Sequence, residues 1–433
     1  MLLLSTLSIL LTMIPPKTIA RPTRPQLAWQ RMEMGMFIHF APNTWRNLEG
    51  DDLQEPLADI NPAGLDTDQW CRAARGFGAK YVVFVAKHIG GFCMWQTHTT
   101  DYGIRETPWR NGHGDVMADL AASCAKYHLK LGFYLSPRDD HFGAGIGGIC
   151  KDPARQAAYT RIYREQLKEL LTRYGPICEV WFDGNLKLPV DDILRQYAPN
   201  AVFFQGPLAS IRWIGNEDGL APYPTWNTVA PDKAATGAAT GADGDPDGAT
   251  WLPAEVDVSI RRPYWFWSTT NAQNRLSTGQ LVDIYQRSVG HGCNLLLNVP
   301  PNTDGRIDAG DFAALQAFGA ALRTLYGKPV ATARGRGMLL TVHLARPVRI
   351  GRLVLKERIA NGARVRAFTI EGQTPAGWRQ VAEGTAIGSK LILNCPPVAV
   401  TSVRLIITRA EGVPEIARMA VYAEDEAAGN SSP

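Results

Sequence analysis

Predicted strands and helices alternate from about residue 30 to residue 326 of this 433-residue chain. The predicted strands are runs rich in β-branched and aromatic residues, at 36–40, 81–86, 131–136, 178–182, 201–204 and 295–299. The predicted helices carry apolar residues at three- and four-residue steps, at 66–76, 115–127, 154–174, 280–289 and 311–326. This order predicts βαβ units around a parallel sheet. Because at least six units follow one another and no GxGxxG motif marks the first turn, a (β/α)8-type barrel over residues 21–328 is favoured over a doubly wound sheet.

The pattern changes after residue 328. Short alternating strands follow, at 338–344, 348–355, 363–370, 378–382, 390–393, 403–408 and 416–422. Turns separate them about every 10 residues, which is typical of an antiparallel β-sandwich. We therefore predict a C-terminal β-sandwich over residues 329–424 and a polar, disordered tail over 425–433. Within the barrel, segment 230–250 is rich in Gly, Ala and Asp, which predicts a long exposed loop.

The first 20 residues resemble a secretory signal peptide. An apolar core at 2–14 is followed by two prolines and by the small residue Ala20, although no Lys or Arg precedes the core. Cleavage near Ala20 would make the mature protein periplasmic or secreted, with no integral membrane span. The alternatives are a misassigned start codon and a membrane-tethered N-terminus.

Charge and cysteine patterns narrow the range of partners. The 45 basic and 41 acidic residues are scattered, so nothing indicates a nucleic-acid partner. The seven cysteines are spread singly and form no CxxC pair, so no zinc ribbon or other metal site is expected. The oligomeric state is left open.

Polar and aromatic residues follow the predicted strands at the positions where a barrel carries its chemistry. The residues at these strand ends are His39, Lys87, His88, Arg138, Asp139, Asp183, Arg212, Glu217 and Glu255. One such residue alone is more often structural than functional. Their recurrence at six strand ends predicts a polar, aromatic-walled pocket at one mouth of the barrel.

Carboxylates in an aromatic pocket suit glycoside hydrolysis, in which one attacks the anomeric carbon and another protonates the leaving oxygen. Asp183, at the end of an apolar strand, is the best candidate for the nucleophile. Glu217 and Glu255 are the candidates for the acid. The structural alternatives are a turn at Asp183, a helix cap at Glu217 and an ion pair between Glu255 and Arg261 or Arg262.

Seven sequence motifs, taken together, resemble those of the α-L-fucosidases of glycoside hydrolase family 29. The resemblance runs from about residue 30 to residue 422 through MGMFIHFAPNTW, AKHIGGFCMWQTHTTDY, GFYLSP, EVWFDG, RWIGNE, WLPAEVDVSIRRPYWFW and NLLLNVPPNTDGRI. It implies a barrel with a C-terminal β-sandwich and a fucosylated oligosaccharide or glycoconjugate as substrate. It also implies a retaining double displacement through a covalent fucosyl-enzyme, without a cofactor.

The resemblance also assigns roles to individual residues. Asp183 in WFDG matches the nucleophile. Side chains expected to bind the sugar are His39, Glu49, His88, Trp95, Tyr134, Trp181, Arg212 and Trp265. The chain departs from the family pattern at Ile89, where a second histidine is usual, and at Gly50, where a tryptophan is usual.

The acid/base is the most serious departure. Many members carry a Glu just before the residue that is Trp226 here, and this chain has Thr225 there. Glu255, in the well-matched WLPAEVDVSI motif, is the first candidate and Glu217 the second. The resemblance thus implies an exo-acting α-L-fucosidase, and the wording of its motifs favours α-1,3/1,4 linkages. The alternatives are a related exo-glycosidase, such as an α-L-galactosidase, and a non-catalytic carbohydrate-binding protein.

Overall fold

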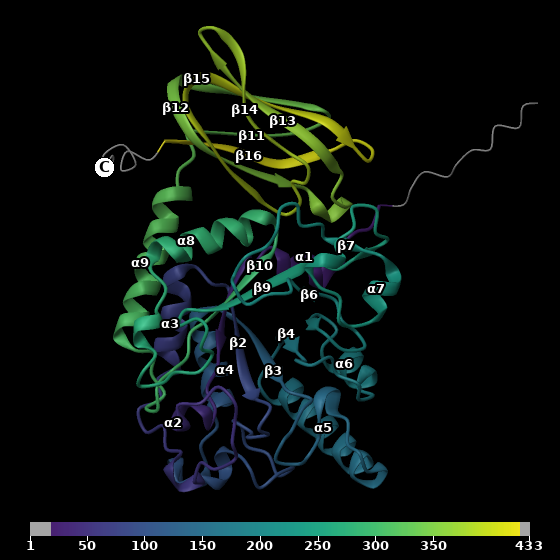
Figure 1. Ribbon diagram of the computed structural model, residues 1–433, viewed down its shortest axis with the longest axis vertical. Helices are drawn as coiled ribbons and strands as arrows, with labels where there is room; N and C mark the ends of the chain where they lie inside the picture. The colour runs from purple at the N-terminus through teal and green to yellow at the C-terminus, as the bar shows by residue number, and fades with distance from the viewer. Residues whose placement is uncertain (1–18, 425–433) are drawn as a thin grey trace, which may run out of the picture.

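A computed structural model describes residues 19–424, in which eight parallel strands form a barrel (Figure 1). The strands are β1 (Met34–Ile38), β2 (Tyr81–Lys87), β3 (Lys130–Leu135), β4 (Ile177–Trp181), β5 (Val202–Phe204), β6 (Arg212–Trp213), β9 (Ala254–Ser259) and β10 (Asn294–Asn298). Their order in the sheet is β5-β4-β3-β2-β1-β10-β9-β6. A single parallel bridge between Phe204 and Ile211 closes the barrel. The predicted barrel is confirmed, but β6 and β9 are additional to the predicted strands.

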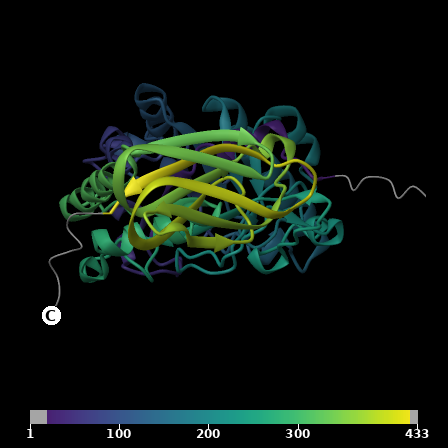
Figure 2. The same ribbon diagram turned by 90° about the horizontal axis from the view of Figure 1, so that it is seen from above.

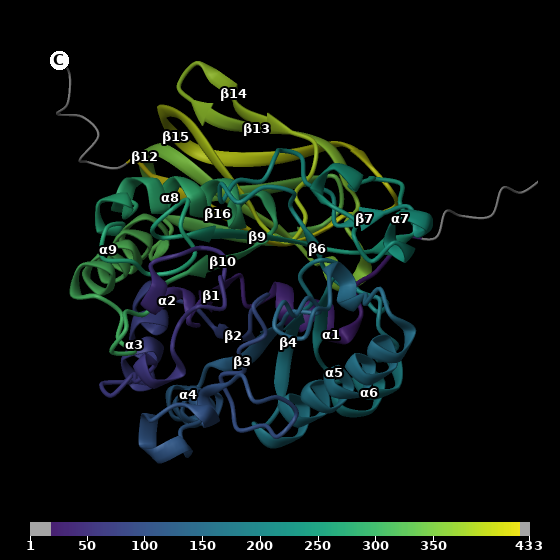
Figure 3. The same cartoon turned by 60° about the horizontal axis from the view of Figure 1, so that its bottom comes forward.

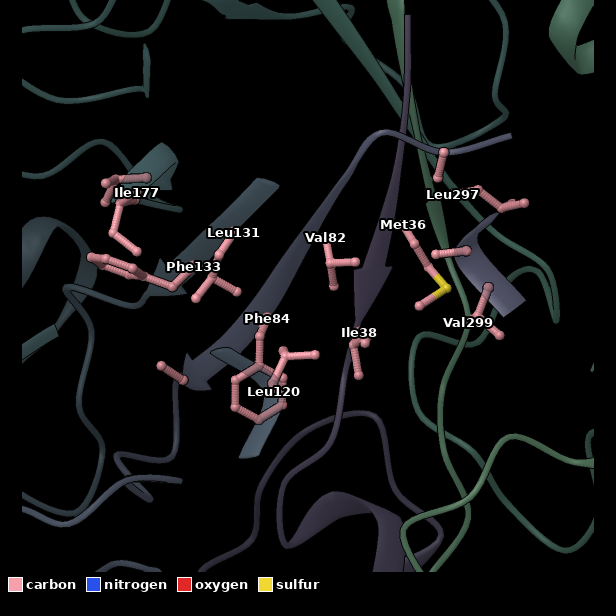
Figure 4. Packing of buried hydrophobic residues seen from close by; sticks show 14 of the residues in the cluster. Met36, Ile38, Val82, Phe84, Leu120, Leu131, Phe133, Ile177, Leu297 and Val299 are labelled. Carbon is pink, nitrogen blue, oxygen red and sulfur yellow. The ribbon is translucent and has the colours of Figure 1, made fainter. Parts of the chain in front are cut away.

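Alternate residues along the barrel strands serve two different cores. On β1, Met36 and Ile38 face outward and pack with the surrounding helices, whereas Phe37 faces the barrel interior. Figure 4 shows the outer layer, in which Val82, Phe84 and their neighbours from adjacent strands lie side by side. Because both faces of each strand are covered, β1, β2 and β10 are mostly apolar and wholly buried.

Helices surround the strands, as Figures 1 and 3 show. They are α1 (Arg24–Gln30), α2 (Asn43–Arg46), α3 (Thr67–Phe77), α4 (Val116–Tyr127), α5 (Pro153–Arg173), α6 (Asp191–Tyr197), α7 (Pro231–Ala235), α8 (Thr278–Arg287) and α9 (Ala309–Tyr326). Capping residues set several of the starts: Asp66, Asp115, Asp152 and Ser277 each accept a hydrogen bond from a first-turn backbone N–H. No described helix is long and apolar enough to cross a membrane.

The C-terminal part is a six-stranded antiparallel sheet with its own apolar core. Its strands are β11 (Ala331–Arg336), β12 (Leu339–Glu357), β13 (Val365–Thr374), β14 (Gly377–Gly384), β15 (Leu391–Ala410) and β16 (Glu415–Ala423). The strands predicted at 338–344 and 348–355 form one long strand, β12, and those predicted at 390–393 and 403–408 form another, β15. Each continues through β-bulges where a turn was predicted. The sheet lies over the barrel (Figure 2). It contacts the N-terminal ends of β1 and β10 through Glu33 and Gly292, away from the carboxyl ends of the strands.

Segment 230–250 differs from the predicted exposed loop. It contains α7 and lies within the hairpin formed by β7 (Thr228–Val229) and β8 (Thr250–Trp251). Val229, Ala239 and Leu252 form a small apolar cluster, so alanines in this segment do pack. The predicted signal peptide lies almost wholly outside the described residues, and the predicted tail lies wholly outside them.

Candidate active site

The carboxyl ends of the barrel strands surround a pocket with about 280 Å³ of space for water. Its walls are Phe37, His39, Glu49, His88, Tyr134, Trp181, Asp183, Phe204, Gln205, Trp213, Glu217, Asp257, Trp265 and Phe266. Eight of the eleven predicted site residues are therefore brought together. Among residues 19–424, no cluster of three or more His, Cys, Asp or Glu side chains could hold a metal ion.

Asp183 follows β4 and accepts a hydrogen bond from the Tyr134 hydroxyl at 3.1 Å. Burial raises the pKa of the Asp183 carboxyl, and the hydrogen bonds from Tyr134 and from the Gly184 backbone N–H oppose that rise by stabilising the anion. The turn after Asp183 is held by Gln205, whose Oε1 accepts from the Asn185 backbone N–H at 2.7 Å. Gly184, Asn185 and Gln205 all have positive φ angles, so this part of the pocket wall has a sharply defined backbone.

Two neutral histidines form one side of the pocket. Burial lowers the pKa of His39 to about 3 and that of His88 to about 4. Asn298 donates from Nδ2 to the Trp265 carbonyl, so its Oδ1 faces His39 Nδ1 at 2.9 Å. His39 therefore carries its proton on Nδ1 and leaves Nε2 as an acceptor. The His88 Nδ1 atom is buried without a hydrogen-bond partner in the described chain.

Trp265 is held between two carboxylates from different loops. Its backbone N–H donates to Glu49 Oε2 at 2.7 Å, and its indole N–H donates to Glu217 Oε2 at 3.2 Å. Burial raises the pKa of Glu49, and the backbone donors of Trp265 and Phe266 oppose that rise. Glu217 is an exposed loop residue after β6, so it lies at the rim of the pocket and does not cap a helix.

Asp257 is a pocket carboxyl that the sequence analysis did not select. It accepts a hydrogen bond from the Trp213 indole N–H at 2.7 Å. Burial raises the pKa of Asp257 to about 7, and the nearby carboxylates Glu217 and Asp183 act in the same direction. The signal was present in the WLPAEVDVSI motif, because Asp257 follows Glu255 by two residues and so faces the same side of β9, nearer its carboxyl end.

Three predicted site residues lie outside the pocket. Glu255 is fully buried in the barrel interior and pairs neither with Arg261 nor with Arg262. Trp95 is buried outside the pocket and donates its indole N–H to Glu169 on α5 at 2.8 Å. Arg212 is buried and donates to the backbone carbonyls of Thr240 and Trp226. These placements leave Asp183, Glu217, Glu49 and Asp257 as the carboxyl groups of the pocket.

A (β/α)8 barrel with carboxyl groups in an aromatic pocket at its carboxyl end defines the molecule as a glycoside hydrolase. Comparison with known proteins identifies the family. A family model described as "Alpha-L-fucosidase" matches residues 51–327. The chain is similar to "Alpha-L-fucosidase 1" of Arabidopsis thaliana, with 33% identity covering 99% of this chain and 92% of the plant protein.

Solved structures agree with this relationship. A glycoside hydrolase 29 family member from an unknown rumen bacterium has 31% sequence identity and a TM-score of 0.83, covering 95% of this chain and 78% of that one. A Ruminococcus gnavus GH29 fucosidase in complex with fucose has 25% identity and a TM-score of 0.83, covering 95% and 96%. The chain belongs to the α-L-fucosidase family, glycoside hydrolase family 29, and its activity is the hydrolysis of α-L-fucosides.

Proposed function

We propose that this protein is a retaining exo-α-L-fucosidase in which Asp183 is the nucleophile and Glu217 is the acid/base. The observation that carries the proposal is that both carboxyl groups line one pocket, whereas Glu255 does not reach it. The Glu217 carboxyl also accepts a hydrogen bond from Trp265, which orients it at the rim where a leaving group would sit.

In the first step the Asp183 carboxylate attacks the anomeric carbon, and the bond to the leaving oxygen breaks as Glu217 donates its proton to that oxygen. In the second step water attacks the anomeric carbon, Glu217 accepts a proton from the water, and the ester to Asp183 breaks. The Tyr134 hydroxyl supports the Asp183 anion in the resting enzyme. Burial from solvent makes that carboxylate a stronger nucleophile than an exposed one.

The sugar would be held by polar groups on one side and aromatic rings on the other. His39, His88, Glu49 and Asp257 offer acceptors and donors for hydroxyl groups. Phe37, Trp181 and Trp265 offer apolar surface for the ring and its C6 methyl group. One feature supports exo action: Trp181 and Phe37 occupy the barrel interior, so the pocket is closed below the sugar.

The preferred substrate is proposed to be α-1,3/1,4-linked fucose on a branched glycan. The support is the wording of the sequence motifs that the chain shares with the family. Export to the periplasm or the cell exterior is proposed from the sequence of residues 1–20 alone. N-terminal sequencing of the protein from the culture or periplasmic fraction tests it, and a start at Met1 would contradict it.

The test of the mechanism compares an aryl α-L-fucoside with a Lewis-type oligosaccharide, using the wild type, Asp183→Ala and Glu217→Ala. Asp183→Ala should lose about 10³-fold or more on both substrates. Glu217→Ala should lose far more on the oligosaccharide, because an aryl leaving group needs less protonation. Azide should rescue both variants, giving the inverted fucosyl azide from Asp183→Ala and the retained one from Glu217→Ala.

Other outcomes would redirect the proposal. Full activity of Asp183→Ala or Glu217→Ala on the oligosaccharide would contradict the corresponding role. Faster turnover of an aryl α-L-galactoside would favour an α-L-galactosidase, since a pocket that accepts a methyl group only mildly rejects an added hydroxyl.

A further inference from the structure

Two glutamate side chains, Glu179 on β4 and Glu255 on β9, meet in the barrel interior without any exposure to solvent. Glu179 accepts from the Trp29 indole at 2.6 Å and from the Trp181 indole at 2.7 Å. Glu255 accepts from the Tyr81 hydroxyl at 2.8 Å and from the same Trp181 indole at 2.9 Å. The Trp181 N–H is therefore shared between two carboxyl groups.

The pair carries a single proton. Among residues 19–424, neither carboxyl forms an ion pair with a basic side chain, and two adjacent buried negative charges would be strongly destabilising. Burial and the adjacent Glu179 raise the pKa of Glu255 well above its usual range, and the two side chains are hydrogen-bonded to one another. Glu255 is thus the protonated donor, and Glu179 is the carboxylate that accepts from both indoles.

Trp181 connects this pair to the pocket. It ends β4 two residues before Asp183, and its ring lies parallel to Phe204 at a centroid distance of 3.5 Å. Both rings line the pocket. The Trp181 indole N–H points away from the pocket, toward the carboxyl pair. Its hydrogen bonds therefore fix the side-chain torsion angles that orient the ring.

We propose that Glu179 and Glu255 form a one-proton positioning pair that holds Trp181 flat as the floor of the sugar site. The inference rests on the proposed function and deepens it, because it gives Glu255 a role other than acid/base. Glu179 supplies the anionic acceptor, and Glu255 supplies the proton that lets a second carboxyl lie beside it. Neither residue touches the substrate.

The test exploits the asymmetry of the pair. Glu255→Gln keeps a donor toward Glu179 and an acceptor for Tyr81, and it loses only the 2.9 Å contact from the Trp181 indole, which Glu179 still accepts; it should retain kcat and KM within about twofold of the wild type. In the wild type the Trp181 and Trp29 indoles donate to different oxygens of Glu179, so Glu179→Gln leaves one acceptor for two indoles and turns an amide N–H toward the other; it should raise KM about tenfold with a smaller change in kcat. It should also alter the near-ultraviolet circular dichroism of tryptophan. Glu357→Gln is the matched control. Glu357 is a buried carboxyl of the C-terminal sheet that accepts hydrogen bonds from the backbone N–H groups of Arg364, Val365 and Gly388. This variant should leave KM unchanged.

The outcomes separate this proposal from the proposed function. An unchanged KM in Glu179→Gln, or equal damage from both Gln variants, would overturn the positioning pair. A Glu255→Gln variant that loses kcat mainly on the oligosaccharide would instead overturn Glu217 as the acid/base. If Glu179→Gln does not fold, Tyr81→Phe is a milder test, because it removes one donor to Glu255 without touching Trp181. It should raise KM by about fivefold, and a KM within about twofold of the wild type would count against the pair.

Discussion

Two carboxyl residues that lie two positions apart on the same side of a barrel strand can have different roles, because one lies deeper in the barrel than the other. Glu255 and Asp257 face the same interior side of β9. Glu255 lies deep enough to be covered by Trp181 and Tyr81, whereas Asp257 reaches the pocket. Choosing between them needs the depth of each residue below the mouth of the barrel, which the register between β9 and β10 determines.

Asp257→Asn should change how stability depends on pH. In the unfolded chain Asp257 ionises near its ordinary pKa of 3.8, whereas the folded protein retains the proton up to about pH 7. The folded state therefore binds more protons in this window, so Asp257 lowers the free energy of unfolding as the pH rises. The variant should gain stability relative to the wild type between about pH 4 and pH 7, by up to about 4 kcal/mol.

Denaturant unfolding of both proteins at several pH values measures this difference. The two proteins should be closest at about pH 4, where neither carries a charge at this position. A constant difference across the whole range would show that Asp257 ionises normally. Activity should fall in the variant above about pH 7, where the wild-type Asp257 is ionised, since an amide cannot accept a sugar hydroxyl as strongly as a carboxylate.

Motif order identified most of the pocket, and the errors have physical causes. Asp183, His39 and Trp181 are strand-end residues whose positions follow from the barrel geometry alone. Arg212 and Trp95 have the same residue chemistry, but their side chains satisfy partners within the protein. A sequence pattern does not reveal whether such a side chain meets a backbone carbonyl or a ligand.

At the scale of elements, the two strands that were not predicted complete the barrel. The β6 strand has only two residues, too few for any periodicity to be visible. The β9 strand alternates Glu255, Asp257 and Ser259 with apolar residues, a pattern more typical of a half-exposed strand than of a fully buried one. The side of β9 that faces the barrel interior is polar because its residues line or support the pocket.

Arg212→Met should loosen the segment between β7 and β8. Arg212 holds this segment through the Thr240 carbonyl and holds the chain just before β7 through the Trp226 carbonyl, and the segment also accepts a hydrogen bond from Asn185 at Thr236. Loss of two buried charge-assisted hydrogen bonds should lower the free energy of unfolding by about 2–4 kcal/mol. Trypsin should then cleave at the exposed Lys233 faster than in the wild type. An unchanged rate of cleavage would mean that other contacts hold the segment.

At the scale of the whole molecule, the barrel and the C-terminal sheet are joined by an ionic cluster. Glu33, just before β1, accepts from Lys356 at 2.5 Å and from Lys390 at 2.7 Å. Burial alone would raise the pKa of Glu33, but the charges and hydrogen bonds of the two lysines prevail and lower it to about 2. Most of the predicted division between barrel and sheet follows from periodicity, but no local pattern marks these three residues as partners.

Glu33→Gln should destabilise the junction in a pH-dependent manner. Because the folded-state pKa lies below the ordinary value of 4.5, the stabilisation is complete above about pH 4.5 and is lost as the pH falls toward 2. The variant should lose about 2 kcal/mol at pH 7, with the difference from the wild type shrinking in acid. Calorimetric unfolding measures it, with Asp52→Asn at the exposed Arg46 ion pair as the control that should change little. A loss that is equal at pH 3 and pH 7 would contradict the ionic origin.

The single bridge between Phe204 and Ile211 makes the barrel wall unequal around its circumference. Asp183 lies on one side of this seam, after β4, and Glu217 lies on the other, after β6. Every other pair of neighbouring barrel strands is joined by a ladder of at least two residue pairs. The distance between these two carboxyl groups therefore spans the weakest strand junction of the barrel. A change in the 205–211 loop would alter that distance and leave the other strand pairs unchanged.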